Sequence, residues 1–92
     1  MLMSNSKEFL IAAETVKKLS EKPNNDELKV LYGFYKQAVV GDCNTDKPGM
    51  FDFKEKAKWE SWNSNKGMSK YNAEVNYITY VNQLIQKHGL VD

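Results

Sequence analysis

Apolar residues near the start of the chain recur three or four positions apart, the spacing of one buried helix face. They are Phe9, Ala12, Ala13, Val16 and Leu19. Asn5 precedes them with Glu8 three positions later, a pair typical of a capping box. The pattern predicts a first helix over residues 5–20, followed by a break that contains Pro23.

The second predicted helix, residues 24–40, is apolar over a wide arc. Asn24 with Glu27 three positions later again predicts a capping box, and Gly41 is placed to end the helix. Its two apolar stripes are Leu28, Leu31, Tyr32, Tyr35 and Val39, and beside them Val30, Phe34 and Ala38. A helix with so wide an apolar arc has neighbours on more than one side, so we expect it to be the central one.

Two further helices are predicted after a loop at residues 42–50, which are rich in turn formers. Asp52 begins the third helix, which carries Phe53, Ala57, Trp59 and Trp62, and Gly67 closes it. Ser69 begins the fourth, and Gly89 ends it. Because no strand alternation of useful length is present, the expected fold class is all-α: a four-helix bundle with a long loop between helices two and three.

Composition narrows the class of protein. Ninety-two residues fit one domain, expected to span 1–92. No apolar run approaches the ~18 residues of a membrane-spanning helix, and the start lacks a secretory signal. A single cysteine, Cys43, with a single histidine, His88, makes neither an internal disulfide nor a structural zinc site. We therefore expect a reduced, cytoplasmic domain without a metal.

The charge is balanced overall but uneven along the chain. Thirteen lysines face twelve acids, and arginine is absent, which disfavours nucleic acid as a partner. Residues 47–70 hold six lysines and only three acids. This segment therefore predicts a local field that attracts anions.

Catalytic residues are not evident. His88 falls in the last turn of the fourth helix, where a solvated residue is expected, and Cys43 has no histidine near it in sequence. Neither a glycine-rich phosphate loop nor a metal-ligand cluster is present in the sequence. We expect no enzyme activity and no cofactor.

Tyrosines and lysines form the most informative pattern. Tyr32, Tyr35 and Lys36 share one face of the second helix, while Lys54 and Lys58 share one face of the third. One interpretation is that the tyrosines are core aromatics and the lysines a solvated face. The other is a lined groove, because a buried tyrosine is costly unless its hydroxyl finds a partner.

Four sequence blocks decide between these interpretations. They are YGFYKQA at 32–38, NTDKPGM at 44–50, KAKWESW at 56–62 and KGMS at 66–69. In this order and spacing they resemble the acyl-CoA-binding protein family, also called diazepam-binding inhibitor, and the similarity runs from about Phe9 to Leu84.

The resemblance implies an up-down-down-up bundle that binds long-chain acyl-CoA thioesters such as palmitoyl-CoA. The family's tyrosines and lysines surround the adenine and the ribose 3′-phosphate, and the acyl chain lies in an apolar groove. The implied ligand-binding residues are Lys17, Tyr32, Gly33, Phe34, Tyr35, Lys36, Lys54, Lys58 and Tyr77.

The implied function is that of a carrier and buffer of acyl-CoA, monomeric and without catalysis, in transient contact with acyl-CoA-using enzymes. The alternative is a helical protein-interaction module without a small-molecule ligand, which predicts an exposed apolar stripe. Two details remain open. Glu55, between Lys54 and Lys58, is expected to weaken the phosphate field, and Gly33 is explained either by close approach of a ligand or by simple tolerance inside the helix.

Overall fold

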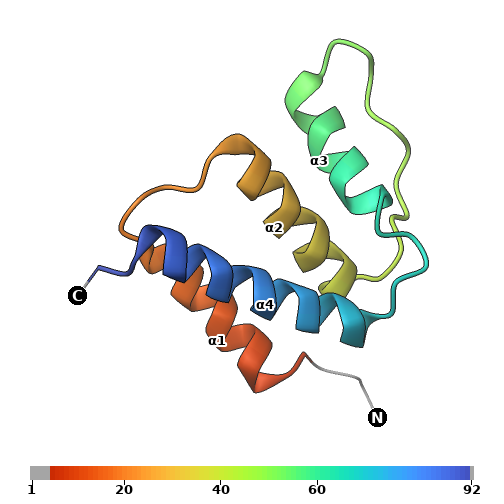
Figure 1. The fold of residues 1–92 in the computed structure, drawn as a ribbon. Coiled ribbons are helices and arrows are strands. Elements are labelled where there is room, and N and C mark those ends of the chain that lie inside the picture. The colour runs from red at the N-terminus through yellow and green to blue at the C-terminus, as the bar shows by residue number, and fades with distance from the viewer. Residues whose placement is uncertain (1–4, 92) are drawn as a thin grey trace.

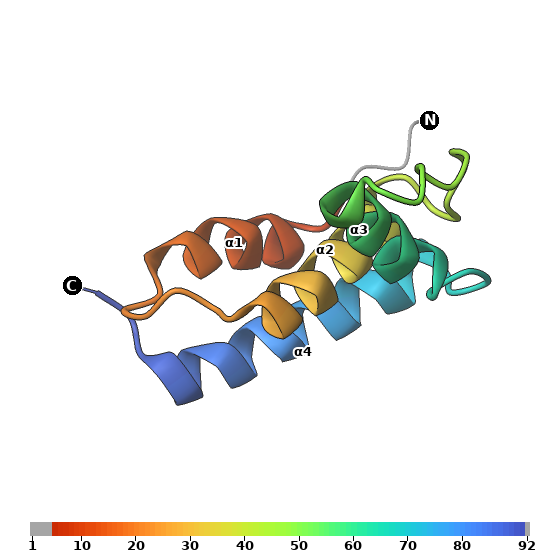
Figure 2. The same ribbon diagram turned by 90° about the horizontal axis from the view of Figure 1, so that it is seen from above.

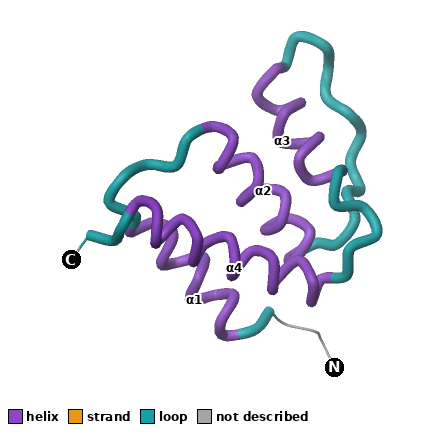
Figure 3. The backbone as a smooth tube through the Cα atoms, viewed as in Figure 1, coloured by secondary structure: helices purple, strands orange, loops and turns teal. Residues whose placement is uncertain are grey.

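Four α-helices and one short 3₁₀ helix form the bundle in the computed structural model, which describes residues 5–91 (Figures 1 and 3). The elements are α1 (Lys7–Thr15), η1 (Val16–Lys18), α2 (Asn25–Val39), α3 (Phe53–Asn63) and α4 (Lys70–His88). No strand forms among these residues, and the helices follow one another up, down, down and up. The prediction of an all-α four-helix fold is confirmed.

The central position predicted for the second helix is also confirmed. α2 packs against α4 on one side and α3 on the other, and α1 packs against α4 (Figure 1). No Cα pair between α1 and α2 lies within 8 Å, and α3 contacts no helix other than α2 within the described chain. The bundle is therefore flat, 40 × 39 × 15 Å, with an open notch between α1 and α2.

The core lies where α1, α2 and α4 meet. Its buried residues are Phe9, Ala12, Leu31, Ala38, Ala73, Tyr77, Val81 and Leu84. α3 contributes Trp62, which is 5% exposed, while Phe53 at its start is 73% exposed. The third helix is thus held by its C-terminal half, because the apolar residue at its beginning does not pack into the core.

Helix starts follow the predicted caps at two places and depart from them at a third. Asn24 and Glu27 form the expected capping box, and Ser69 caps α4. At α1 the prediction of Asn5 as cap is wrong, because Ser6 accepts the bond from the Phe9 N–H.

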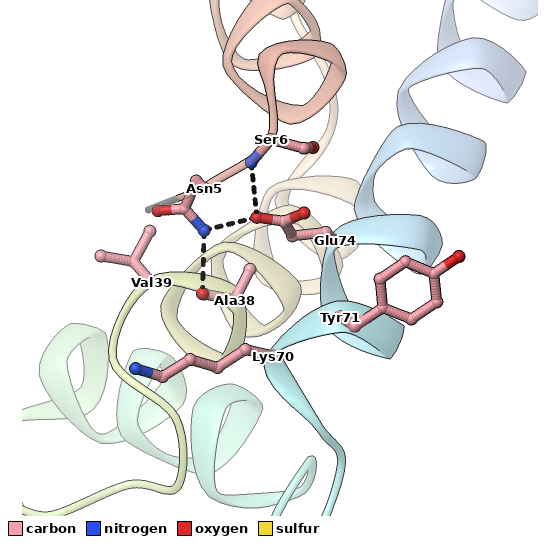
Figure 4. Close-up of a pocket in the computed structure, with 7 residues that line it drawn as sticks. All are labelled: Asn5, Ser6, Ala38, Val39, Lys70, Tyr71 and Glu74. Atoms are coloured by element: carbon pink, nitrogen blue, oxygen red, sulfur yellow. Dashed lines mark hydrogen bonds between the residues drawn. The ribbon is translucent and has the colours of Figure 1, made fainter. Parts of the chain in front are cut away.

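Asn5 instead makes long-range hydrogen bonds. Its amide donates to the Ala38 carbonyl at 3.0 Å and to Glu74 Oε2 at 2.6 Å, and the Ser6 N–H donates to the same carboxylate oxygen at 3.1 Å (Figure 4). Glu74 is a buried acid on α4, and these two donors compensate part of its desolvation. The chain leading into α1 is thereby fixed to α2 and α4.

The first helix ends earlier than predicted. α1 stops at Thr15 rather than near residue 20, and the chain becomes extended at Leu19 (ψ 137°). There it pairs with the segment after α4: Val91 N–H donates to the Lys18 carbonyl at 2.9 Å, and Ser20 N–H donates to the Gly89 carbonyl at 2.8 Å (Figure 2). This tertiary pairing takes over the backbone groups that a longer helix would have used.

The third helix also ends before its predicted stop. Its C-cap is Ser64, and Gly67, three residues later, has φ +92° in the turn that leads to α4. The Gly67 N–H donates to Asp42 Oδ1 at 2.9 Å, and the Gln37 amide donates to the same oxygen. Gly67 therefore shapes the connection between α3 and α4 rather than closing α3.

His88 is not the solvated residue that its position suggested, and that expectation is wrong. Its side chain is 11% exposed, with Nδ1 2.9 Å from Glu21 Oε1 and Nε2 3.1 Å from Glu27 Oε1. Lys87 Nζ lies 2.8 Å from the other oxygen of Glu27. Because both ring nitrogens face carboxylate oxygens, the imidazolium satisfies both contacts, and the pKa of His88 is raised by Glu21 and then by Glu27.

We expect the stabilisation from His88 to depend on pH. A raised pKa means that it is fully present below about pH 6.5 and is lost as pH rises through the folded-state value. Glu27, whose pKa is lowered to about 2 by Lys87 and by the Asn24 N–H, contributes above its ordinary value of 4.5 and loses this as pH falls. Melting temperatures of the parent and His88→Gln should differ most near about pH 5–6 and converge in mild alkali. A difference that grew toward alkaline pH would contradict the assignment.

Candidate ligand-binding site

The notch between α1 and α2 is a hollow of about 470 Å³ with α4 as its floor. Its lining residues are Leu10, Ala13, Glu14, Val16, Lys17, Tyr35 and Tyr77. Three of them, Lys17, Tyr35 and Tyr77, are residues that the sequence predicts to bind a ligand. They come from three separate elements, so the fold itself brings them together.

Aromatic rings form the base of this hollow. The ring centroids of Phe9, Tyr35 and Tyr77 lie 5.0–5.8 Å apart in all three pairings. Phe9 is fully buried, Tyr77 is 4% exposed and Tyr35 is 40% exposed. Tyr35 therefore presents an aromatic surface to a ligand while the other two rings support it.

Burial, with a smaller contribution from Tyr35, raises the pKa of Tyr77 to about 12. The Tyr77 hydroxyl is therefore neutral throughout the physiological range. A neutral phenol donates one hydrogen bond and repels no anion.

Lys17 supplies a positive charge at the edge of the hollow. Its Nζ lies 2.8 Å from Glu14 Oε2, and both side chains are more than 70% exposed. Glu14 raises the pKa of Lys17, so the amine stays charged. An exposed pair of this kind is weakly held, because water screens it. An anionic ligand can therefore replace Glu14 as the partner of Lys17 at little cost.

A second cluster of predicted residues lies where α2 meets α3. Lys58 Nζ is 5.2 Å from the centroid of the Tyr32 ring, and Lys36 Nζ is 4.7 Å from that of Trp62. Glu55 Oε1 lies 3.6 Å from Lys58 Nζ, which gives a direct contact to the weakening that the sequence predicts for Glu55. Lys54 is exposed in the first turn of α3, four residues before Lys58.

These two groups of residues share one face of the central helix. Tyr32, Tyr35 and Lys36 stand at i, i+3 and i+4 of α2, so they lie side by side along it. Tyr35 belongs to the hollow beside α1, and Tyr32 belongs to the contact with α3. The result is a continuous surface in which aromatic rings alternate with ammonium groups.

Two predicted residues lie elsewhere. Phe34 points to other flanks of α2, where it lines one small hollow with Val30 and Asn65 and another with Asn76 and Tyr80. Neither hollow contains any other predicted binding residue. The structure therefore does not bring Phe34 to the tyrosine–lysine surface.

Gly33 is buried against α3. A Cβ atom built there would lie 2.5 Å from the Ser61 carbonyl oxygen, which is backbone and cannot move aside cheaply. The close approach of α3 therefore accounts for glycine at this position without any ligand.

The sequence did not single out the apolar wall of the hollow. Leu10 is 54% exposed, and with Ala13 and Val16 it forms the α1 side of the notch. A signal was present, since the apolar run from Phe9 to Ala13 is unbroken and wider than one buried face needs.

The described residues offer no other chemistry in this region. Among residues 5–91 no group of three or more His, Cys, Asp or Glu side chains could hold a metal ion. Nor is any helix of that part of the chain long and apolar enough to cross a bilayer. The surface can bind a ligand that is both anionic and partly flat or apolar.

Comparison with known proteins identifies what this arrangement resembles. The family model described as Acyl CoA binding protein matches residues 6–81. Acyl-CoA-binding protein homolog 1 of Caenorhabditis elegans is 54% identical over 78 residues, covering 85% of this chain and 91% of that protein.

Solved structures agree. The crystal structure of Oryza sativa Acyl-CoA-Binding Protein 2 is similar with a TM-score of 0.84 and 42% identity, covering 88% of this chain and 90% of that one. The solution structure of the yeast Acyl Coenzyme A Binding Protein is similar with a TM-score of 0.73 and 48% identity, covering 91% of this chain and 98% of that one.

Proposed function

Because this chain belongs to the acyl-CoA-binding protein family, we propose that it binds long-chain acyl-CoA thioesters such as palmitoyl-CoA and carries them unchanged. The observation that supports this best is the surface on α2 where Tyr32, Tyr35 and Lys36 join the hollow beside α1 to the lysines of α3. The ligand has two unlike ends, a polyanionic nucleotide and a hydrocarbon chain, and this surface offers a partner to each.

The nucleotide end would lie against tyrosines and lysines. An aromatic ring such as that of Tyr35 stacks on adenine, a contact worth ~1–3 kcal/mol per base in nucleic-acid complexes. The ammonium groups of Lys17, Lys36 and Lys58 would neutralise phosphates, and Lys54 would extend the same field. Charge-assisted hydrogen bonds of this kind contribute ~1.5–3 kcal/mol each. The neutral Tyr77 hydroxyl adds a donor at the floor of the hollow.

The acyl chain would lie on apolar side chains next to these groups. Leu10 in the wall of the hollow and Leu28, one turn before Tyr32 on α2, are both partly exposed and apolar. Such residues gain by being covered, because each CH₂ removed from water contributes up to ~0.8 kcal/mol. Gly33 and Phe34 are left out of the proposed contact surface, since α3 accounts for the first and the second lies on other flanks.

The role proposed is that of a monomeric, cytoplasmic carrier and buffer. The site contains no nucleophile or base beside the thioester position, so acyl-CoA would leave as it arrived. Enzymes that make or use acyl-CoA would be its transient partners.

A test of the phosphate contact separates a specific site from a diffuse field. If Lys58 pairs with the 3′-phosphate, Lys58→Ala should weaken palmitoyl-CoA binding by ~1.5–3 kcal/mol, roughly ten- to a hundredfold, in calorimetric titration. Palmitoyl-dephospho-CoA lacks only that phosphate, so the parent should bind it weakly and Lys58→Ala should weaken it little further.

Two variants sharpen this comparison. Lys36→Ala run through the same cycle reports whether the phosphate is held from α2 as well as from α3. Lys87→Ala is the matched control, because Lys87 pairs with Glu27 at the far end of α4 and should leave both affinities unchanged. Equal losses of both ligands in Lys58→Ala would assign Lys58 to a general positive field.

A further inference from the structure

The loop before α3 carries the most exposed cluster of large apolar side chains on the protein. Met50 is 70% exposed, Phe51 is 84% exposed and Phe53 is 73% exposed. Among the described residues only Tyr71, on α4, has comparable exposure. Three large apolar groups within four residues are more than the scattered single ones that soluble proteins ordinarily expose.

A tight turn presents these side chains. The Asp52 N–H donates to the Gly49 carbonyl at 3.0 Å, which closes a four-residue turn with Met50 and Phe51 at its two corners. Turn corners are normally occupied by Gly, Pro, Asn, Asp or Ser, because these residues favour the geometry and tolerate water. Two large apolar residues at the corners gain nothing from the turn itself, so their presence needs another reason.

The turn is held in place rather than hanging free. The Trp59 indole N–H donates to the Thr45 carbonyl at 2.8 Å, and Lys47 Nζ lies 4.0 Å from Glu60 Oε2. Both contacts tie the loop to α3. The apolar corner is therefore presented in a fixed position at the periphery of the fold (Figures 1 and 2).

The surroundings of the turn are basic. Lys47 precedes it, Lys54 and Lys56 follow it, and residues 47–70 hold six lysines against three acids, while the rest of the chain is net negative. The nearest acids are Asp46, Asp52 and Glu55, which reduce the field without reversing its sign. An apolar point within a lysine-rich segment has the character of a surface that enters the headgroup region of an anionic bilayer.

The shape of the turn argues for a bilayer over a protein partner. A stable protein interface needs about 800 Å² from each side, which one turn does not supply, and no hollow lined by Met50, Phe51 or Phe53 is present to receive a partner's side chain. A bilayer interface needs no complementary shape. Long straight lysine side chains reach headgroups while apolar side chains go below them.

We propose that the turn at residues 49–52, with Phe53 and the lysines around it, is a docking point for anionic lipid surfaces. This goes beyond carrying acyl-CoA and does not require a bound ligand. It would bring the lysine–tyrosine surface close to a bilayer, where a molecule with a long acyl chain partitions.

The test uses the full chain without acyl-CoA and vesicles of phosphatidylcholine with or without phosphatidylserine. The parent should co-sediment with phosphatidylserine vesicles, and this binding should fall with added salt and be at least about tenfold weaker on phosphatidylcholine alone. Met50→Ser/Phe51→Ser should reduce binding to phosphatidylserine vesicles by at least about tenfold. Tyr71→Ser, equally exposed but on α4, is the matched control and should bind as the parent does.

Two readouts make the outcome decisive. Phe51→Trp should shift its emission to the blue on vesicles and be quenched by brominated lipid, whereas Tyr71→Trp should do neither. Palmitoyl-CoA affinity should be unchanged in Met50→Ser/Phe51→Ser, which shows that the variant is folded. The proposal is overturned if the parent does not bind phosphatidylserine vesicles, if the double variant binds as well as the parent, or if Tyr71→Ser loses as much.

Discussion

Replacing Trp62 by alanine is expected to lower the free energy of unfolding by ~3–5 kcal/mol, the range for removing a large buried aromatic side chain. Trp62 is 5% exposed, and its indole N–H donates to the Gly41 carbonyl at 2.8 Å. Lys36 lies over the same ring. Since α3 contacts only α2 among the described helices, loss of this anchor should release much of what holds α3 in place.

Trp59→Ala is the matched comparison, because it removes the same side chain one turn earlier. Trp59 is only half-buried, and it bonds the Thr45 carbonyl in the loop. Its removal should cost clearly less than that of Trp62 in chemical denaturation followed by circular dichroism. If both variants melt within a few degrees of the parent, the packing of α3 described above is wrong.

The second large effect should appear in the ligand. Shortening the acyl chain from sixteen carbons to eight removes eight CH₂ groups, worth up to ~0.8 kcal/mol each when buried. Ordering costs and incomplete burial reduce this sum, so we expect affinity to fall at every step and by at least about a hundredfold across the series. Titrations of acyl-CoAs of graded length measure it, with free CoA as the control without a chain. Equal affinity across the series would remove the apolar surface from the account.

Local sequence patterns predicted what local physics determines. Asn24 and Glu27 lie three residues apart and cap α2 on their own, and Ser69 does the same for α4. The central place of α2 followed from its wide apolar arc. Tyr32, Tyr35 and Lys36 share a face because helical spacing alone puts them there.

Long-range contacts account for what the sequence did not reveal. Asn5 has a capping pattern but bonds Glu74, 69 residues away. His88 has the position of a solvated residue, yet Glu21 and Glu27 reach it from 67 and 61 residues away. The early end of α1 depends on backbone pairing with Val91. No window of neighbouring residues contains these partners.

The candidate site divides in the same way. Gly33 and Phe34 belong to the same block as the tyrosines, but helix geometry turns one toward Ser61 and the other toward other flanks. Leu10 was missed for the opposite reason, since its place in the notch depends on α1 and α2 staying apart. Block similarity gives residue identity, whereas the bundle determines which side chains meet.

Calorimetric titration of the protein with palmitoyl-CoA tests the central claim most directly, with palmitate and CoA titrated separately as controls. The account predicts saturable one-to-one binding of palmitoyl-CoA, a negative heat-capacity change from buried apolar surface, and much weaker binding of either half alone. A folded protein that gave no saturable binding of palmitoyl-CoA, or that bound palmitate as tightly as the thioester, would contradict it.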